Sequence, residues 1–213
     1  MSRREIRLAA ACGGLFAVTF GVALLLLADL LGSFADSDDT FAEYFDSEAD
    51  RNLSAAGGVL LFISGVVLLP FLTGVVRAVD TDSGSRRGWL AGTLSPIASG
   101  LVIASAAALA TVGASRLMAD VFDESSEPFQ GSSIVVLPQL GYVLMVFGAW
   151  TMGMILALTG SLLMKTRALP PALGWAAFVC AAILVLAPGV SPLVMLPAWV
   201  LVASVLLFRL NIE

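Results

Sequence analysis

The chain has 213 residues, of which 59% are hydrophobic and only 13% are charged, and its mean hydropathy is +0.97. Soluble domains carry about 25% charged residues, so this composition excludes an ordinary soluble domain, a disordered chain and a coiled coil. The net charge of −5 excludes the basic surface that nucleic-acid binding needs. Since a membrane span takes about 20 residues, the length accommodates roughly six spans with their loops.

Six apolar runs follow one another along the chain, each of the length that a membrane helix needs. Acidic loops at 32–52 and 115–133 separate the first run from the second and the third from the fourth. We therefore predict an all-α fold, a polytopic transmembrane bundle of six spans that forms a single domain over residues 1–213. The predicted spans are residues 8–31, 53–76, 88–114, 134–164, 171–188 and 191–208.

The basic residues gather on one side of this predicted topology. With the N-terminus inside the cell, the inner side holds Arg3, Arg4, Arg7, Arg77, Arg86, Arg87, Lys165, Arg167 and Arg209, and the outer side only Arg51 and Arg116. An excess of Lys and Arg in cytoplasmic segments is the rule for membrane proteins. The sequence therefore predicts a multi-pass protein of the cell membrane with both termini in the cytoplasm.

The first run has two interpretations. The small residues Ser33 and Ala35, after an Arg-rich start and an apolar stretch, are typical of a secretory signal with its cleavage site. The apolar core of such a signal has about 7–15 residues, however, and the run at 8–31 is longer. We therefore expect the first run to be retained as a helix.

Small residues recur every four positions in the third run, which would place them on one drifting face of a helix. Such a face lets another helix approach closely, so we predict that it packs inside the bundle. The hydroxyls of Ser95 and Ser99 flank Pro96 and are expected to satisfy carbonyls that the missing N–H leaves free. An alternative is a bend that lines a cavity. The predicted packing residues are Gly88, Gly92, Pro96 and Gly100.

Gln139 and Tyr142 in the fourth run are three residues apart and therefore share a helix face. A glutamine amide in hydrocarbon is costly unless it faces protein or water. Such a group either forms a hydrogen bond between helices or belongs to a small polar pocket. The candidate pocket, between the third and fourth spans, consists of Asp29, Ser95, Ser99, Arg116, Gln139 and Tyr142.

The chain has no histidine and only two cysteines, Cys12 and Cys180. The usual catalytic zinc sites, bis-histidine haem and a Ser-His-Asp triad therefore lack their central residue. We expect no cofactor, no metal site and no catalytic residue, and hence no enzyme. The predicted function is a non-catalytic binding, assembly or modulatory component, whose partners are membrane lipids and a protein partner or a second copy, and not nucleic acid. The alternative is a small permease or a lipid- or small-molecule-binding protein that uses the candidate pocket.

The turn before the fifth span reads R-A-L-P-P-A-L-G-W over residues 167–175. It resembles the R-x-L-P-R-x-L-G-W-like turn of an uncharacterised bacterial and archaeal family of six-helix integral membrane proteins. Pro171 stands where that family often has a basic residue. The resemblance implies a six-span topology and supplies no catalytic residues.

Overall fold

The computed structural model describes residues 3–28, 30, 47–79, 86–122, 132–166, 170–186 and 191–210. Over these residues it consists of six α-helices and one short 3₁₀ helix, with no strand. This confirms the predicted all-α class. The elements are α1 (Arg3–Leu26), α4 (Glu48–Val79), α5 (Arg86–Phe122), α6 (Ser132–Thr166), α7 (Pro171–Leu186), the 3₁₀ helix η1 (Ser191–Val194) and α8 (Met195–Leu210).

Four of the described helices, α1, α4, α5 and α6, are long and apolar enough to cross a membrane. The other two, α7 and α8, are equally apolar but have only 16 residues each. Helices form throughout because, in hydrocarbon, every backbone N–H and C=O must be satisfied within the segment. The outer surface is apolar as well, with Leu25 77% and Leu186 79% exposed. A helix that is hydrophobic all round is typical of a membrane environment.

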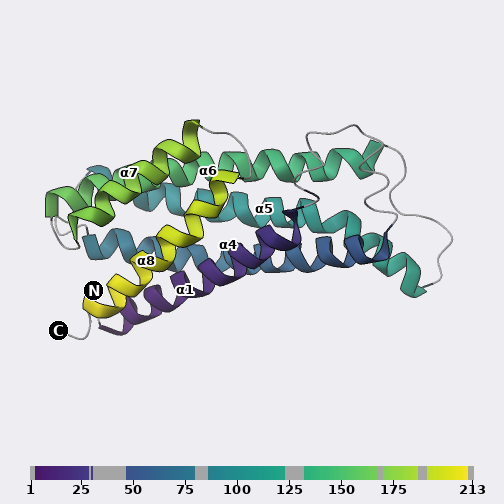
Figure 1. The fold of residues 1–213 in the computed structure, drawn as a ribbon, viewed down its shortest axis with the longest axis horizontal. Helices are drawn as coiled ribbons and strands as arrows, with labels where there is room; N and C mark the ends of the chain where they lie inside the picture. Colours follow the sequence, from purple (N-terminus) through teal and green to yellow (C-terminus); the bar gives the residue numbers. More distant parts are fainter. Residues whose placement is uncertain are drawn as a thin grey trace.

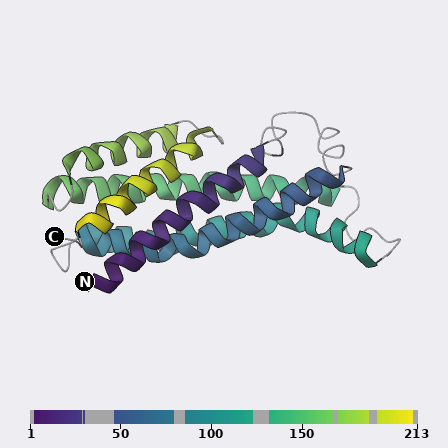
Figure 2. The ribbon, with the colours of Figure 1, turned by 60° about the horizontal axis from the view of Figure 1, so that its bottom comes forward.

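The helices pack side by side in the order α8, α1, α4, α5, α6, α7, whereas α7 and α8 contact each other only sparsely. The beginning of α1 and the end of α8 lie at the same end of the bundle (Figures 1 and 2). At this end α7 and α8 cover the longer helices, which continue alone toward the opposite end (Figure 1).

The core lies between the helices and is filled by large apolar side chains. Phe16 and Phe20 of α1 stack with their ring centroids 5.0 Å apart, and Phe71 of α4 is fully buried with them. Where α8 meets α7, the indole N–H of Trp199 in α8 donates to the carbonyl of Leu173 in α7 over 3.5 Å. One apolar core thus includes residues from all six helices.

The helix ends differ from the predicted loop boundaries. The loop predicted at 115–133 is helical up to Phe122 and again from Ser132, and the loop predicted at 32–52 already becomes helical at Glu48. A helical hydrogen-bond ladder is internal, so it continues where the chain leaves an apolar layer, and hydropathy does not mark its end. The last predicted span, 191–208, begins with the 3₁₀ turn η1 instead of α-helix.

Candidate functional site

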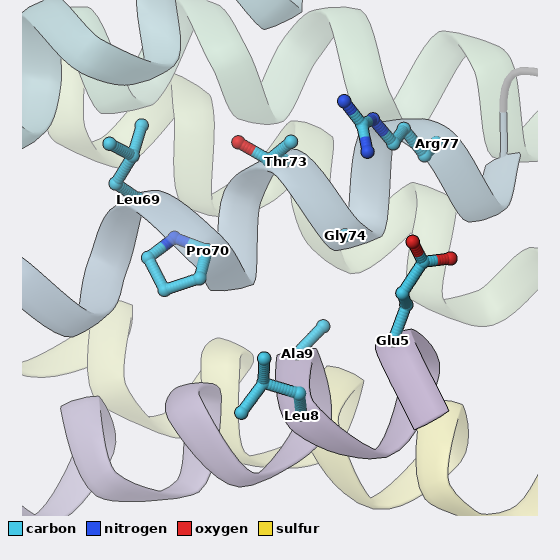
Figure 3. Close-up of a pocket in the computed structure, with 8 residues that line it drawn as sticks. All are labelled: Glu5, Leu8, Ala9, Leu69, Pro70, Thr73, Gly74 and Arg77. Atoms are coloured by element: carbon cyan, nitrogen blue, oxygen red, sulfur yellow. The ribbon is translucent and has the colours of Figure 1, made fainter. Parts of the chain in front are cut away.

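A groove of about 310 Å³ lies between α1 and α4, near the beginning of α1 and the end of α4 (Figure 3). It is open along one side. Its lining consists of Glu5, Leu8 and Ala9 from α1, and Leu69, Pro70, Thr73, Gly74 and Arg77 from α4.

The floor of the groove is made by small residues. Ala9 is 3% exposed, and Gly74 on the facing helix is also buried. One turn further along α1, Gly13 lies so close to Phe71 of α4 and Ser204 of α8 that a Cβ there would overlap both side chains. The three helices are therefore in close contact at Gly13, one turn beyond the groove residue Ala9.

The two ends of the groove differ in polarity. Leu8 (62% exposed), Leu69 (38% exposed) and Pro70 form an apolar wall. The exposed side chains of Glu5 and Arg77 lie at the other end, one on each helix, and the Glu5 carboxylate points toward α4 (Figure 3). The groove therefore has the polarity of an amphipathic molecule, with a long apolar side and a charged rim.

The candidate pocket between the third and fourth spans is not assembled in the structure. Ser95 is 0% exposed and its hydroxyl donates to the carbonyl of Ala91 in its own helix, over 2.8 Å. Gln139, by contrast, is exposed on the surface of α6, and Tyr142 is half-buried. The prediction that Ser95 and Gln139 line one pocket is wrong, because one side chain is enclosed between helices and the other is open to the surroundings.

The remaining residues of that candidate pocket do not restore it. Ser99 is 3% exposed and, within the described part of the chain, its hydroxyl has no hydrogen-bond partner. The two serines therefore do not both act as expected beside Pro96, since Ser95 bonds to Ala91 and Ser99 to no described group. Asp29 and the side chain of Arg116 lie outside the described part of the structure.

The predicted packing stripe of α5 also needs correction. Gly88 is buried, but Gly92, Pro96 and Gly100 are exposed. A Cβ at Gly92 or at Gly100 would meet no atom of the described residues within 4 Å. The face of α5 that packs is rotated away from this stripe and carries Ala91, Ser95, Ala98, Ser99, Val102, Ser105 and Leu109.

Close approach of α5 to its neighbours depends on glycines of the partner helices instead. A Cβ at Gly65 of α4 would lie 2.6 Å from Cγ1 of Ile103, and one at Gly141 of α6 would lie 2.8 Å from Cγ of Leu109. The stripe was misassigned because small residues permit close packing but do not show which helix face receives a neighbour.

Sequence reasoning missed the groove, although Arg77 had been assigned to the inner end of the second predicted span. Glu5 and Arg77 are charged residues at the same predicted end of the first two spans, so their proximity follows once these spans are neighbours. The space of the groove depends on two small residues, Ala9 of α1 and Gly74 of α4, which lie on facing helices. No sequence motif indicates that these two residues come together.

Among the described side chains, no three His, Cys, Asp or Glu residues gather as a metal site, and Cys12 and Cys180 are both free. Comparisons with protein-family models, curated proteins and solved structures find no match to this chain. The resemblance carried by residues 167–175 therefore stays a prediction, and the function is argued from the groove.

Proposed function

We propose that the chain is a non-catalytic integral membrane protein of the cell membrane, and that it binds a membrane lipid in the groove between α1 and α4. The observation that carries this proposal is the polarity of the groove, whose apolar wall continues into a rim with Glu5 and Arg77. A lipid has the same division into an apolar chain and a polar headgroup. Leu8 of the groove lining is 62% exposed, so the groove is open to the surface of the bundle, which carries further large apolar side chains.

The charge distribution supports a cytoplasmic position for this rim. The helix ends on the same side as the groove carry Arg3, Arg4, Arg7, Arg77, Arg86, Arg87, Lys165 and Arg209. The positive-inside rule assigns that side to the cytoplasm. The lipid would therefore come from the cytoplasmic leaflet, and both termini would be cytoplasmic.

Binding is a better explanation than transport for the polar groups within the bundle. The buried serines and threonines with described partners bond to backbone carbonyls or to each other, as in Ser54 with Leu109 and Thr19 with Ser64. These hydroxyls are thus used within a helix or between two helices, and they are not left over to line a path for an ion or a polar solute. The groove itself is lined on α1 by residues no further along the helix than Ala9.

Native mass spectrometry of the protein released from lipid-containing micelles tests the proposal. Thr73 is half-buried and lines the groove, so Thr73→Phe places an aromatic ring in the lipid site. The matched control is Thr93→Phe on α5, where the threonine is exposed and donates to the carbonyl of Trp89 in its own helix. We expect one retained lipid with the wild type and with Thr93→Phe, and loss of that lipid with Thr73→Phe. Equal lipid retention by all three proteins would contradict the proposal.

A further inference from the structure

We infer that the groove selects phospholipids whose headgroup carries both a phosphate and a primary ammonium group. This inference rests on the proposed lipid site and adds the chemical class of its ligand. It is carried by the two charges of the rim, which have opposite sign and come from opposite helices, Glu5 from α1 and Arg77 from α4 (Figure 3).

Arg77 is the group that recognises the phosphate. Its guanidinium is always charged and offers several N–H donors in a planar fork, which matches two oxygens of a phosphate. Arg77 is exposed at the end of α4, one helical turn beyond Gly74 of the groove floor. In Figure 3 the guanidinium lies on the side of α4 away from α1. Because Arg77 is exposed and its side chain is long, it can turn toward the phosphate of a headgroup whose chain lies along Leu8 and Pro70.

Glu5 is the group that distinguishes one headgroup from another. A carboxylate accepts hydrogen bonds at about four lone-pair positions, so it can receive an ammonium N–H in addition to contacts within the protein. The same carboxylate repels the phosphate of a headgroup that contains no positively charged group. Within the groove lining, Glu5 and Arg77 together have zero net charge, which complements a headgroup that is itself zwitterionic.

Two other common headgroup classes fit this rim less well. A phosphoglycerol headgroup satisfies Arg77 but leaves Glu5 facing an anion. A phosphocholine headgroup has the right charges, but its quaternary ammonium has no N–H to donate to the carboxylate. A phosphoethanolamine headgroup satisfies both residues, and it is the ligand that the rim predicts.

The arginines near the groove make it possible to distinguish headgroup recognition by the rim from a general attraction to positive charge. Arg3, Arg4 and Arg7 lie in the first turns of α1 but do not line the groove. If general positive charge governed lipid binding, anionic phosphoglycerol lipids would be retained best. If the groove rim governs it, the phosphoethanolamine lipid is retained best although it has no net charge.

The experiment is a competition measured by native mass spectrometry. The full-length protein is equilibrated with equal amounts of phosphatidylethanolamine, phosphatidylglycerol and phosphatidylcholine that share the same acyl chains. We expect the ethanolamine lipid to be retained about threefold over each of the others, as one exposed charge-assisted contact allows. Glu5→Gln should remove this preference while one lipid remains bound, and Glu5→Lys should shift it to phosphatidylglycerol.

Two further variants separate the headgroup inference from the lipid site itself. Arg77→Gln should weaken retention of all three lipids, whereas Arg86→Gln, at an exposed position outside the groove and at the same end of the bundle, should leave retention unchanged. Equal retention of the three lipids by the wild type, with Thr73→Phe still abolishing binding, would overturn the headgroup inference and keep the site. Loss of the effect of Thr73→Phe would overturn both.

Discussion

Within the described part of the chain, the hydroxyls of Thr19, Ser64, Ser54 and Ser105 form hydrogen bonds between neighbouring helices. Thr19 of α1 and Ser64 of α4 are hydrogen-bonded through their hydroxyl oxygens over 2.8 Å. Ser54 of α4 donates to the carbonyl of Leu109 in α5, and Ser105 of α5 donates to that of Gly141 in α6, over 3.2 and 2.8 Å. Lipid tails are as apolar as leucine, so such bonds and close packing, not the hydrophobic effect, hold the helices together.

Because a hydroxyl bond between helices contributes to their association, Ser105→Ala should destabilise the bundle more than Ser95→Ala. Both serines lie in α5 and are 0% exposed, but Ser105 bonds to another helix and Ser95 only to Ala91 in its own. The interhelical bond is worth about 0.6 kcal/mol, the average measured for such bonds in membrane proteins. Unfolding by denaturant in mixed micelles measures the difference. Equal losses in the two variants would show that the bond between helices adds no stability.

The residues of the groove illustrate what the sequence could and could not predict. Arg77 was placed at the same end of the bundle as the start of the first helix, which follows directly from the span boundaries, whereas Glu5 was not singled out. Gln139 was expected in a pocket because of its cost in hydrocarbon, yet it is exposed on α6, about two turns after the helix start at Ser132 and at the beginning of the apolar stretch Gln139–Thr166. Polarity alone does not tell an enclosed side chain from one near the end of a span.

Glycine positions determine how closely the helices approach one another. Gly58 of α4 lies against Ala110 of α5, and Gly160 of α6 lies against Gly174 of α7, where a Cβ on Gly160 would be 3.0 Å from the Gly174 carbonyl oxygen. Gly13 of α1 is the tightest of these positions, since it faces two neighbouring helices at once. It lies one helical turn after Ala9, which lines the groove, so the packing of α1 at Gly13 affects the position of the groove lining.

Gly13→Ala and Gly14→Ala, at two adjacent positions of α1, test whether the stability of the bundle depends on the close helix contact at Gly13. A methyl group on Gly13 would lie 2.6 Å from Cε2 of the fully buried Phe71, whereas one on Gly14 would have no atom within 4 Å. We expect Gly13→Ala to lower the unfolding free energy by about 1–3 kcal/mol, as for other overpacked cores. Gly14→Ala should leave it unchanged or raise it by up to about 1 kcal/mol, because alanine favours a helix. Unfolding by denaturant in mixed micelles measures both variants. A Gly13→Ala variant as stable as the wild type would contradict the close contact at Gly13.

The existence of the helices was predictable, but their packing faces were not. Long apolar runs predict helices reliably because the bilayer requires an internally bonded backbone. Within such runs both faces are apolar, so the periodicity that shows the core side of a soluble helix is weak. The four-residue stripe of Gly92, Pro96 and Gly100 therefore looked like a packing face and proved to be exposed.

The whole molecule has a strong charge asymmetry that predicts its orientation. Arg209 is exposed at the end of α8, on the side rich in arginine, and Ala49 is exposed at the beginning of α4, on the opposite side. In a background with Cys12 and Cys180 replaced by alanine, a membrane-impermeant maleimide should label Ala49→Cys on intact cells. Arg209→Cys should react only after the cells are permeabilised. The reverse pattern would place the groove in the outer leaflet and overturn the proposed orientation.

The helices of the bundle differ greatly in length, which affects how it fits a bilayer. With 37 residues α5 is about 55 Å long, whereas α7 has 16 residues and is about 24 Å long. The hydrocarbon core of a typical bilayer is about 30 Å thick. Starting from the proposed cytoplasmic surface, α7 therefore ends beneath the outer surface of the membrane, at the highly exposed Leu186.

We therefore expect thick bilayers to strain the molecule at the end of α7. A lysine at the end of a short helix must reach the surface with its ammonium group, and this becomes harder as the bilayer thickens. Leu186→Lys should thus lower the thermal midpoint increasingly across a series of lipids with longer acyl chains. Leu25→Lys is the matched control, because Leu25 is similarly exposed but lies near the outer end of the 24-residue helix α1. Thermal unfolding in nanodiscs measures both variants. A thickness dependence that is the same for the two lysines would mean that α7 reaches the outer surface as α1 does.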